Sequence, residues 1–333
     1  MQTNIDLTAA WNSYIAKGLM KNVFASSAGK IEAGMRPSPN GPEQYVIDLA
    51  TGQNICEPPQ LKHFANGMEI LFDPFGGLKP YIPPTKSGKQ DELPSAAAAC
   101  VFACQDPANP LSLLKRTPLL QTKFTNHEWL AFPNVTPWEP RGLLLWVPTT
   151  PNETSITLPH QSQILTHAAV EDFLEISLAN ENFITFFNSL NGAASANHLH
   201  FQSCYLNRKM AVELAKQTQK VKYTFTDGYC APALVWPKNI DADTLWEVIA
   251  KIQQTGKPLN LIALSSGIYL FVRNRDNEIV DEFPGRGLGA INLAGMMITG
   301  DKSYFTRVNE NTIASAFAKT TLNPTNLDFL LKE

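Results

Sequence analysis

The chain has 333 residues, of which 44% are hydrophobic and 17% charged, and its formal net charge is −3. This composition is typical of a globular protein with an ample core, and so weak a net charge favours neither nucleic acid nor an acidic membrane surface as a partner. The cysteines are five in number and irregularly spaced, which indicates a reducing cytoplasm rather than a disulfide framework. We expect a cytoplasmic protein, because the N-terminus lacks a signal-peptide pattern and no stretch approaches the ~20 apolar residues of a membrane span.

The N-terminal third combines one helix with irregular chain. Apolar residues at helical spacing over 7–19 predict an amphipathic helix. Residues 35–60 and 74–96 are rich in Pro and Gly, so we expect irregular segments there, around short strands such as 45–49.

The remainder alternates strands and helices. Apolar patterning predicts strands at 119–124, 128–132, 142–147 (ended by Pro148), 183–190 and 198–206, a helix within 161–180, a helical connector at 209–224, helices at 245–254 and 311–319, and a hairpin at 259–274 turning at 265–267. This order predicts an α+β fold with a mostly antiparallel sheet and flanking helices. We divide the chain into residues 1–114, 115–215 and 216–333, with the last two as lobes of one sheet.

The stretch NGAASANHLHFQ, residues 191–202, places polar side chains at every second position. On a strand, His198, His200 and Gln202 would share one face, while Leu199 and Phe201 would anchor the other face in the core. An isolated H-x-H pattern has even odds of being structural. The small residues that precede this pattern favour a functional site over a structural role.

Those small residues can form a phosphate cradle. Small side chains let backbone N–H groups approach a phosphate, and Asn or Ser side chains add hydrogen-bond donors. The candidates for phosphate or nucleotide binding are Asn188, Ser189, Asn191, Gly192 and Ser195. Two cations nearby in sequence, Lys123 and Arg141, could neutralise an outer phosphate, although a solvated surface charge is the commoner role for such residues.

Other site types have weaker support. Cys100 and Cys104 lie four positions apart, and no second pair follows at zinc-finger spacing. The segment GRGLG, residues 285–289, has the wrong glycine spacing for a dinucleotide loop. We expect no metal and no cofactor, although two histidines at i, i+2 could serve as metal ligands. The role of His160 stays open.

The motif and its surroundings resemble a known family. FNSLNGAASANHLHFQSCYL, residues 187–206, resembles the histidine-triad superfamily in its galactose-1-phosphate uridylyltransferase and dinucleoside tetraphosphate phosphorylase branch, and its wording is most similar to the GDP-hexose (GDP-galactose) phosphorylases. FPNVTPWEPRGLLLWVP at 132–148, the segment 259–274 and INLAGMMITGDKSYF at 291–305 extend the resemblance over about 115–310. The resemblance implies a histidine-triad-like fold with two such lobes.

The resemblance also implies roles for individual residues. His200 matches the nucleophile, His198 the first histidine of the motif, and Gln202 the glutamine that contacts the α-phosphate, while Asn188 and Ser195 match loop partners. A neutral imidazole can attack phosphorus through one ring nitrogen while an acceptor holds the N–H of the other. We expect that acceptor to be a backbone carbonyl.

The sequence departs from the family at two places. Residues 141–143 stand where members of this branch often carry a histidine, which is a zinc ligand in the zinc-dependent transferases together with a C-x-x-C pair that this chain lacks. This departure argues against zinc. Asn292 stands where the phosphorylases carry an acidic residue, which leaves the acceptor and the sugar open.

These observations predict a nucleotidyltransferase or phosphorylase that cleaves a GDP-hexose-like nucleoside diphosphate sugar through a nucleotidyl-histidine. Orthophosphate or a sugar phosphate would be the acceptor, and a homodimer is possible. One alternative is a dinucleoside tetraphosphate phosphorylase (ATP adenylyltransferase). Another is a nucleotide-binding protein without catalytic activity, and a third, weaker one is a scaffold whose histidines are structural.

Overall fold

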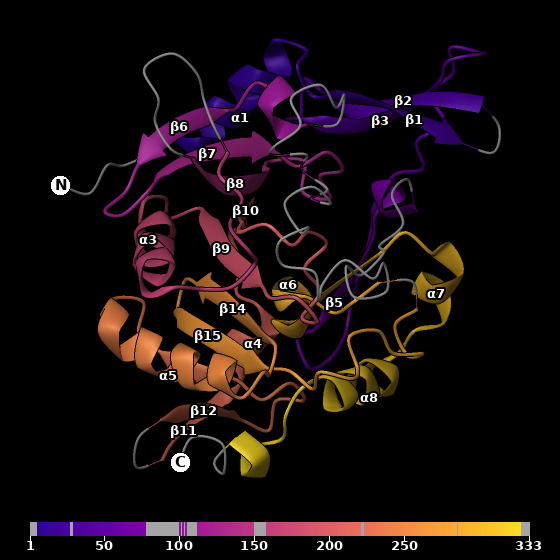
Figure 1. The fold of residues 1–333 in the computed structure, drawn as a ribbon. Coiled ribbons are helices and arrows are strands. Elements are labelled where there is room, and N and C mark those ends of the chain that lie inside the picture. Colours follow the sequence, from indigo (N-terminus) through magenta and orange to yellow (C-terminus); the bar gives the residue numbers. More distant parts are fainter. Residues whose placement is uncertain are drawn as a thin grey trace.

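A computed structural model describes residues 5–26, 29–77, 100, 102, 104, 112–149, 158–220, 223–284 and 286–327. Strands and helices are mixed along the chain (Figure 1). Among the described residues, strand pairs are antiparallel apart from the pair β5 (Glu69–Phe72) and β16 (Met296–Thr299). The predicted α+β class is confirmed. No described helix is both long and apolar enough to cross a membrane.

A ten-stranded sheet occupies the centre of the molecule. Its strands, in spatial order, are β11 (Lys216–Gln219), β12 (Thr224–Asp227), β13 (Leu234–Trp236), β15 (Gly267–Val272), β14 (Leu259–Leu264), β9 (Phe183–Asn188), β10 (Phe201–Tyr205), β8 (Leu143–Thr149), β7 (Glu128–Pro133) and β6 (Leu120–Lys123). Strands β6–β10 come before β11–β15 in the sequence. The two sets join in the middle of the sheet, where β9 pairs with β14.

Each face of the sheet packs against its own hydrophobic core. Helices α3 (His167–Leu178) and α5 (Ala242–Gln254) lie side by side over one face (Figure 1), where they cover Phe187 and Phe201. The opposite face packs against α6 (Ala290–Leu293) and α8 (Glu310–Thr320). Because successive side chains of a strand alternate between faces, the histidines belong to the second face.

Side-chain caps fix where the long helices begin. Thr166, Asp241 and Asn309 each accept a hydrogen bond from the backbone N–H three residues later, at 3.1, 2.8 and 3.0 Å. Such caps satisfy N–H groups that have no partner within the helix. The helices predicted at 245–254 and 311–319 are confirmed to within a few residues.

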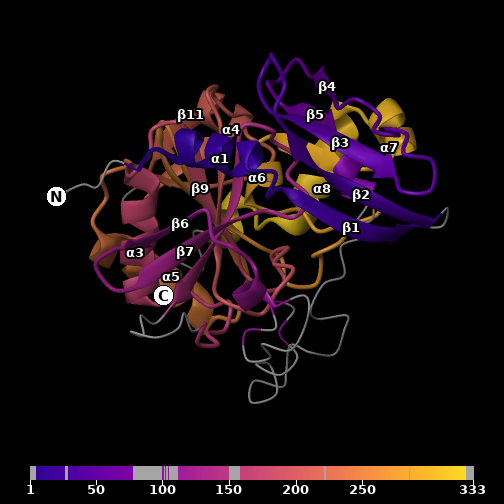
Figure 2. The same ribbon diagram turned by 90° about the horizontal axis from the view of Figure 1, so that it is seen from above.

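The N-terminal third contains more strand than the sequence predicted. It forms α1 (Leu7–Ala16), the sheet β1 (Lys21–Ser26), β2 (Gly29–Arg36) and β3 (Glu43–Asp48), and the hairpin of β4 (Gln60–His63) with β5. Figure 2 shows β1–β3 on the side of the molecule away from α3 and α5. The segment 35–60 is therefore irregular only between strands. Most of 74–96 lies outside the described residues.

Three other predictions need correction. Strand β8 continues through Pro148, because at this position β8 pairs with β7 but no longer with β10, so the missing N–H interrupts no ladder on that side. The connector at 209–224 forms only a short helix, α4 (Ala211–Leu214), before strand β11. Strand β10 begins at Phe201, three residues after His198.

The α7 helix (Lys302–Arg307) follows β16 and packs against β5 and β16. The N-terminal and C-terminal parts of the chain thus share this small sheet, since β5 and β16 come from opposite ends of the sequence.

Candidate active site

His198 and His200 lie between the small-residue loop and the first residue of β10, Phe201. Leu199 and Phe201, 1% and 0% exposed, point into the core under α3 and α5, as the alternation predicted. The two histidines are therefore held on the other face by their apolar neighbours.

The hydrogen bonding of His200 fixes its tautomer. Its Nδ1 lies 2.7 Å from the backbone carbonyl oxygen of His198. A carbonyl oxygen can only accept, so Nδ1 carries the proton and Nε2 keeps its lone pair. Burial lowers the pKa of His200 to about 4, which keeps the ring neutral near pH 7. The expected backbone acceptor is confirmed.

Gln163 holds the backbone of His200 in place. The register of β9 with β10, continued beyond the pair Phe186–Gln202, sets Asn188 opposite His200. Gln163 lies between them, because its Nε2 donates to the carbonyl oxygens of Asn188 (2.8 Å) and His200 (3.2 Å), and its Oε1 accepts from the N–H of His200 (2.9 Å). A side chain here replaces the strand pairing, which explains why β10 begins late.

The loop after β9 has an unusual backbone. Asn191 and Ala193 have φ values of 58° and 75°, a region that residues other than Gly seldom adopt. The N–H of Ala193 donates to Glu278 Oε1 at 3.0 Å. A Cβ on Gly192 would lie 2.8 Å from Ser189 Oγ, so the glycine permits a close approach. Strain of this kind is found at functional sites.

The loop side chains differ in their surroundings. The hydroxyl of Ser189 accepts from the N–H of Leu259 and donates to the carbonyl oxygen of Leu190, so its contacts are structural. Ser195 is exposed, whereas Asn191 and Gln202 are partly exposed. Register places Asn188 opposite His200 and Gln202 two positions after it, while Ser189, Asn191, Gly192 and Ser195 belong to the loop between β9 and the histidines.

The two predicted cations do not join this group. Lys123 lies on the edge strand β6, separated from β10 by β7 and β8, which is about 14 Å at ordinary strand spacing. Arg141 lies beside the far end of β10, where it pairs with both carboxylate oxygens of Glu139 and covers the ring of Tyr205 at 4.4 Å. Arg141 is held there by partners of its own.

Four ligand-type side chains meet next to His200. One ligand atom from each of Cys100, Cys104, His160 and His198 lies within 4.8 Å of the other three. The Nδ1 of His198 is 3.5 Å from Cys100 Sγ, and the Nδ1 of His160 is 3.5 Å from Cys104 Sγ. The ring of Phe102 packs on the histidines, with centroids 5.4 Å from His198 and 5.5 Å from His200.

This cluster has the donor set of a structural zinc site. Two cysteines and two histidines are a common tetrahedral ligand set for zinc. A hydrogen bond from Cys104 and the neighbouring His198 hold the pKa of Cys100 well below its usual value, which favours the thiolate that binds metals. The Nε2 atoms of His160 and His198 are buried without a hydrogen-bond partner among the described residues. The linear spacing from which we expected no metal could not reveal this cluster, because its four residues come together only in the fold.

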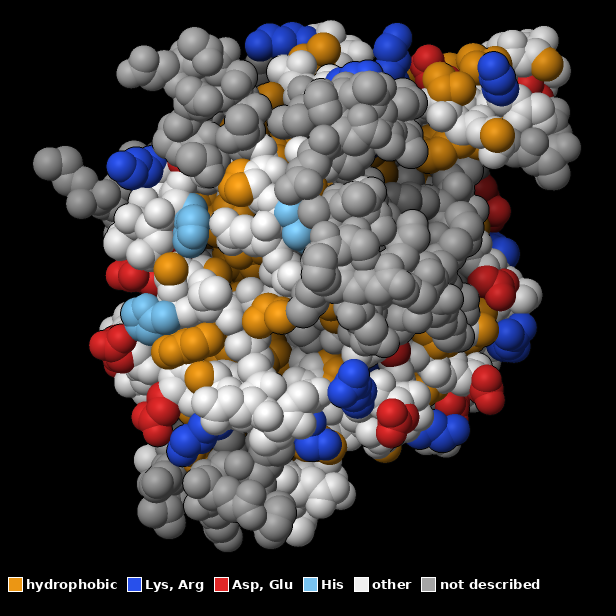
Figure 3. Space-filling model, in the orientation of Figure 1, with side chains coloured by type: hydrophobic (Ala, Val, Ile, Leu, Met, Phe, Trp, Pro, Cys, Tyr) orange, Lys and Arg blue, Asp and Glu red, His pale blue; other side chains and the backbone are white. Residues whose placement is uncertain are grey.

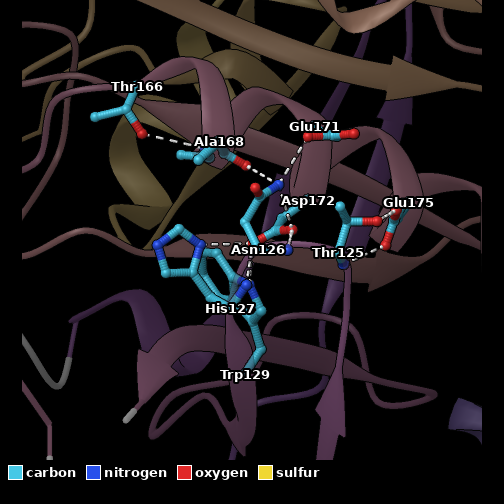
Figure 4. Close-up of polar contacts among 10 residues, drawn as sticks. Thr125, Asn126, His127, Trp129, Thr166, Ala168, Glu171, Asp172 and Glu175 are labelled. Carbon is cyan, nitrogen blue, oxygen red and sulfur yellow. Dashed lines mark hydrogen bonds and ion pairs between the residues drawn. The ribbon is translucent and has the colours of Figure 1, made fainter.

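A second polar cluster, drawn in Figure 4, lies on the face of the sheet that α3 covers, opposite the face of the histidines. The carboxylate of Asp172, on α3 and fully buried, accepts from His127 Nδ1 at 2.7 Å, from Trp129 Nε1 at 2.9 Å and from three N–H groups of Asn126 and His127. These contacts tie α3 to the turn between β6 and β7. Because these donors satisfy a buried carboxylate, we interpret the cluster as structural.

The face drawn in Figure 3 carries Lys and Arg interspersed with Asp and Glu. Such mixing accords with the weak net charge of the chain.

Comparison with known proteins finds one relative by sequence and a solved structure with a similar fold. No family model matches the chain. A segment of 53 residues is 47% identical to GDP-D-glucose phosphorylase 1 of Danio rerio. This segment is 15% of this chain and 16% of that protein. The match thus covers about a sixth of the relative.

The fold likeness extends over nearly the whole chain. Yeast Ap4A phosphorylase in complex with Ap4A superposes with a TM-score of 0.54 at 12% identity, covering 95% of this chain and 97% of that one. A second structure of the yeast enzyme gives a TM-score of 0.50 at 13% identity, covering 95% and 94%. The α+β fold of this chain is similar to that of the yeast phosphorylase, as the resemblance of the HxHxQ motif predicted.

Proposed function

We propose that this chain is a phosphorylase that transfers a nucleotidyl group from a nucleoside diphosphate hexose to orthophosphate through His200. The contact that carries this proposal is the 2.7 Å hydrogen bond from His200 Nδ1 to the carbonyl oxygen of His198, because it leaves Nε2 as a neutral nucleophile. The sequence match to GDP-D-glucose phosphorylase 1 favours a GDP-hexose as the donor.

The reaction divides into two displacements. His200 Nε2 attacks the α-phosphorus, and the bond from this phosphorus to the bridging oxygen breaks, so that hexose 1-phosphate leaves with the electron pair. The His200 ring, now a cation, keeps its Nδ1 proton on the carbonyl oxygen of His198. Orthophosphate then attacks the same phosphorus, which yields the nucleoside diphosphate and returns the electron pair to Nε2.

Neutral donors next to His200 would bind the phosphoryl oxygens. Gln202 lies two positions along on the same face, and Asn188 lies opposite His200. Amide groups do not titrate, so they can stabilise developing charge over a wide pH range. Ser195 and the backbone of the strained loop would add donors for the outer phosphate.

We propose also that Cys100, Cys104, His160 and His198 hold a zinc ion. Bound zinc would fix these side chains without taking part in the displacement. Since the carbonyl oxygen of His198 holds His200, ligation of His198 would keep the nucleophile in register.

The fold similarity to yeast Ap4A phosphorylase favours a second candidate substrate, a dinucleoside tetraphosphate. The same nucleophile and the same first displacement would serve it. The two substrates differ in the leaving group, which is a nucleoside triphosphate in place of hexose 1-phosphate.

Intact-mass spectrometry tests the proposal. The protein is exposed briefly, without phosphate, to GDP-hexoses, other nucleoside diphosphate sugars and Ap4A. We expect a mass increase of one nucleoside monophosphate that His200→Ala abolishes and that the exposed-site control His63→Ala retains. Release of a nucleoside diphosphate on adding orthophosphate would identify orthophosphate as an acceptor. Hexose 1-phosphate should return the adduct to the nucleotide sugar, because this is the reverse of the first displacement.

An unchanged mass with every donor would refute the covalent route. Nucleotide-dependent thermal stabilisation under the same conditions would then indicate a binding protein, because a ligand stabilises only a state that binds it.

A further inference from the structure

A row of polar side chains crosses the sheet on the face that carries the histidines. Strand register sets His200 opposite Asn188, and Asn188 opposite Asn260 on β14. Arg273 follows directly after β15 and reaches the same row through Asn260. Asn260 and Arg273 are fully buried, and no sequence pattern connects them with the motif.

Arg273 sets the direction of the hydrogen bonds in this row. A guanidinium is always charged and can only donate. Its Nε donates to the carbonyl oxygen of Thr320 at 2.9 Å, and its NH1 donates to the carbonyl oxygen of Leu288 and to Asn260 Oδ1, the latter at 2.8 Å. Asn260 must therefore turn its oxygen towards Arg273 and its nitrogen away from it.

The orientation of the Asn260 amide in turn sets the orientation of the Asn188 amide. Asn260 Nδ2 donates to Asn188 Oδ1 at 2.8 Å and to the carbonyl oxygen of Gly192 at 2.6 Å. Asn188 Oδ1 also accepts from the N–H of Ala290 at 2.8 Å. With its oxygen held by two donors, Asn188 has only its NH₂ group left to offer a ligand.

We infer that Arg273 and Asn260 are positioning residues, which orient the amide of Asn188 so that its NH₂ group donates to the phosphate bound at His200. The inference rests on the proposed function for the identity of that phosphate. Asn260 also holds the loop by the carbonyl oxygen of Gly192, so one buried side chain sets both the amide and the loop backbone.

Asn260→Asp tests the inference with almost no change of shape. Asp keeps an acceptor for Arg273 but has no donor for Asn188, so Asn188 Oδ1 keeps only the N–H of Ala290 and faces a carboxylate oxygen, and its NH₂ group is no longer held towards the phosphate. Losing a hydrogen bond to a charged group corresponds to about 10- to 100-fold in affinity. We expect binding of GMP or AMP to weaken by that factor, while binding of guanosine or adenosine stays unchanged.

The matched control is Asn309→Asp, which makes the same charge change at the cap of α8, where Asp is as good a cap as Asn. A second readout combines Asn260→Asp with Asn188→Ala. Since Asn260 acts through Asn188, the double variant should bind the monophosphate no more weakly than Asn188→Ala alone. Melting temperatures show whether each variant is folded.

Three results would overturn the inference: equal weakening for nucleoside and monophosphate, additive effects in the double variant, or a wild type that binds nucleoside and monophosphate equally. These measurements need no turnover. A wild type that binds the monophosphate but forms no covalent adduct would therefore contradict the proposed reaction and leave the inference standing.

Discussion

Gln163 contacts both backbone polar groups of His200, because its Oε1 lies 2.9 Å from the N–H and its Nε2 lies 3.2 Å from the carbonyl oxygen. The same Nε2 donates to the carbonyl oxygen of Asn188. At the point where β9 and β10 separate, one buried amide thus satisfies groups that strand pairing would otherwise satisfy.

Gln163→Glu should destabilise the protein and slow the reaction. The carboxylate cannot donate to two buried carbonyl oxygens, and an unsatisfied buried polar group costs about 1–3 kcal/mol, more when it is charged. We expect the free energy of unfolding in urea to fall by about 3 kcal/mol. The control Gln53→Glu, at an exposed position, should change it by less than about 0.5 kcal/mol. Equal stability of the two variants would show that Gln163 does not hold the strands.

The four-residue cluster should copurify with zinc. Elemental analysis of the protein should find about one zinc per chain, and His160→Ala should lose it, since a structural site needs four ligands. Chelation should lower the melting temperature of the wild type but not of the variant. A wild type free of metal, or a His160→Ala variant that retains it, would count against the site.

Arg141→Ala should leave the KM for phosphate unchanged. The structure places Arg141 at the opposite end of β10 from His200, about 17 Å away at ordinary strand rise. We expect only a loss of about 1 kcal/mol in stability, from the contact with Glu139 and the stacking on Tyr205. A several-fold rise in KM would mean that this end of the strand faces the acceptor after all.

The Asp172→Asn variant should have a lower free energy of unfolding, while the rate at which folded protein catalyses the proposed reaction stays the same. The new NH₂ group would face N–H donors from His127 and Trp129 in a fully buried position (Figure 4). We expect a loss of about 3 kcal/mol, measured by urea denaturation. Glu171→Gln, which removes one charge from the same helix at a partly exposed position, should cost less than about 1 kcal/mol.

Local patterns predicted much of the fold. Apolar alternation located β6, β7, β9, β14 and β15, and helical spacing located α1, α3, α5 and α8. The strand expected at 45–49 corresponds to β3, whereas β1 and β2 were not predicted. Strand β5 was not predicted either, because its partner β16 lies more than 200 residues away in the sequence. The division at 114 and 215, the homodimer and the cytoplasmic location stay predictions.

The site was predictable where its residues are contiguous. The histidines and the small-residue loop could be identified from twelve letters of sequence, whereas Gln163, Asn260 and Arg273 lie far away in the chain and act through hydrogen bonds that no periodicity marks. The cluster of Cys100, Cys104, His160 and His198 was not predicted for the same reason, since Cys104 and His160 meet only after folding.

The pairing of β9 with β14 makes the two halves of the sheet depend on each other. A nick in the connector between β10 and β11 would separate a fragment that carries both histidines from a fragment that carries Asn260. The first fragment alone would expose the edge of β9, a template for self-association. Mixed together, the two fragments would complement each other. Recovery of nucleotide binding would then show that β9 and β14 have paired again.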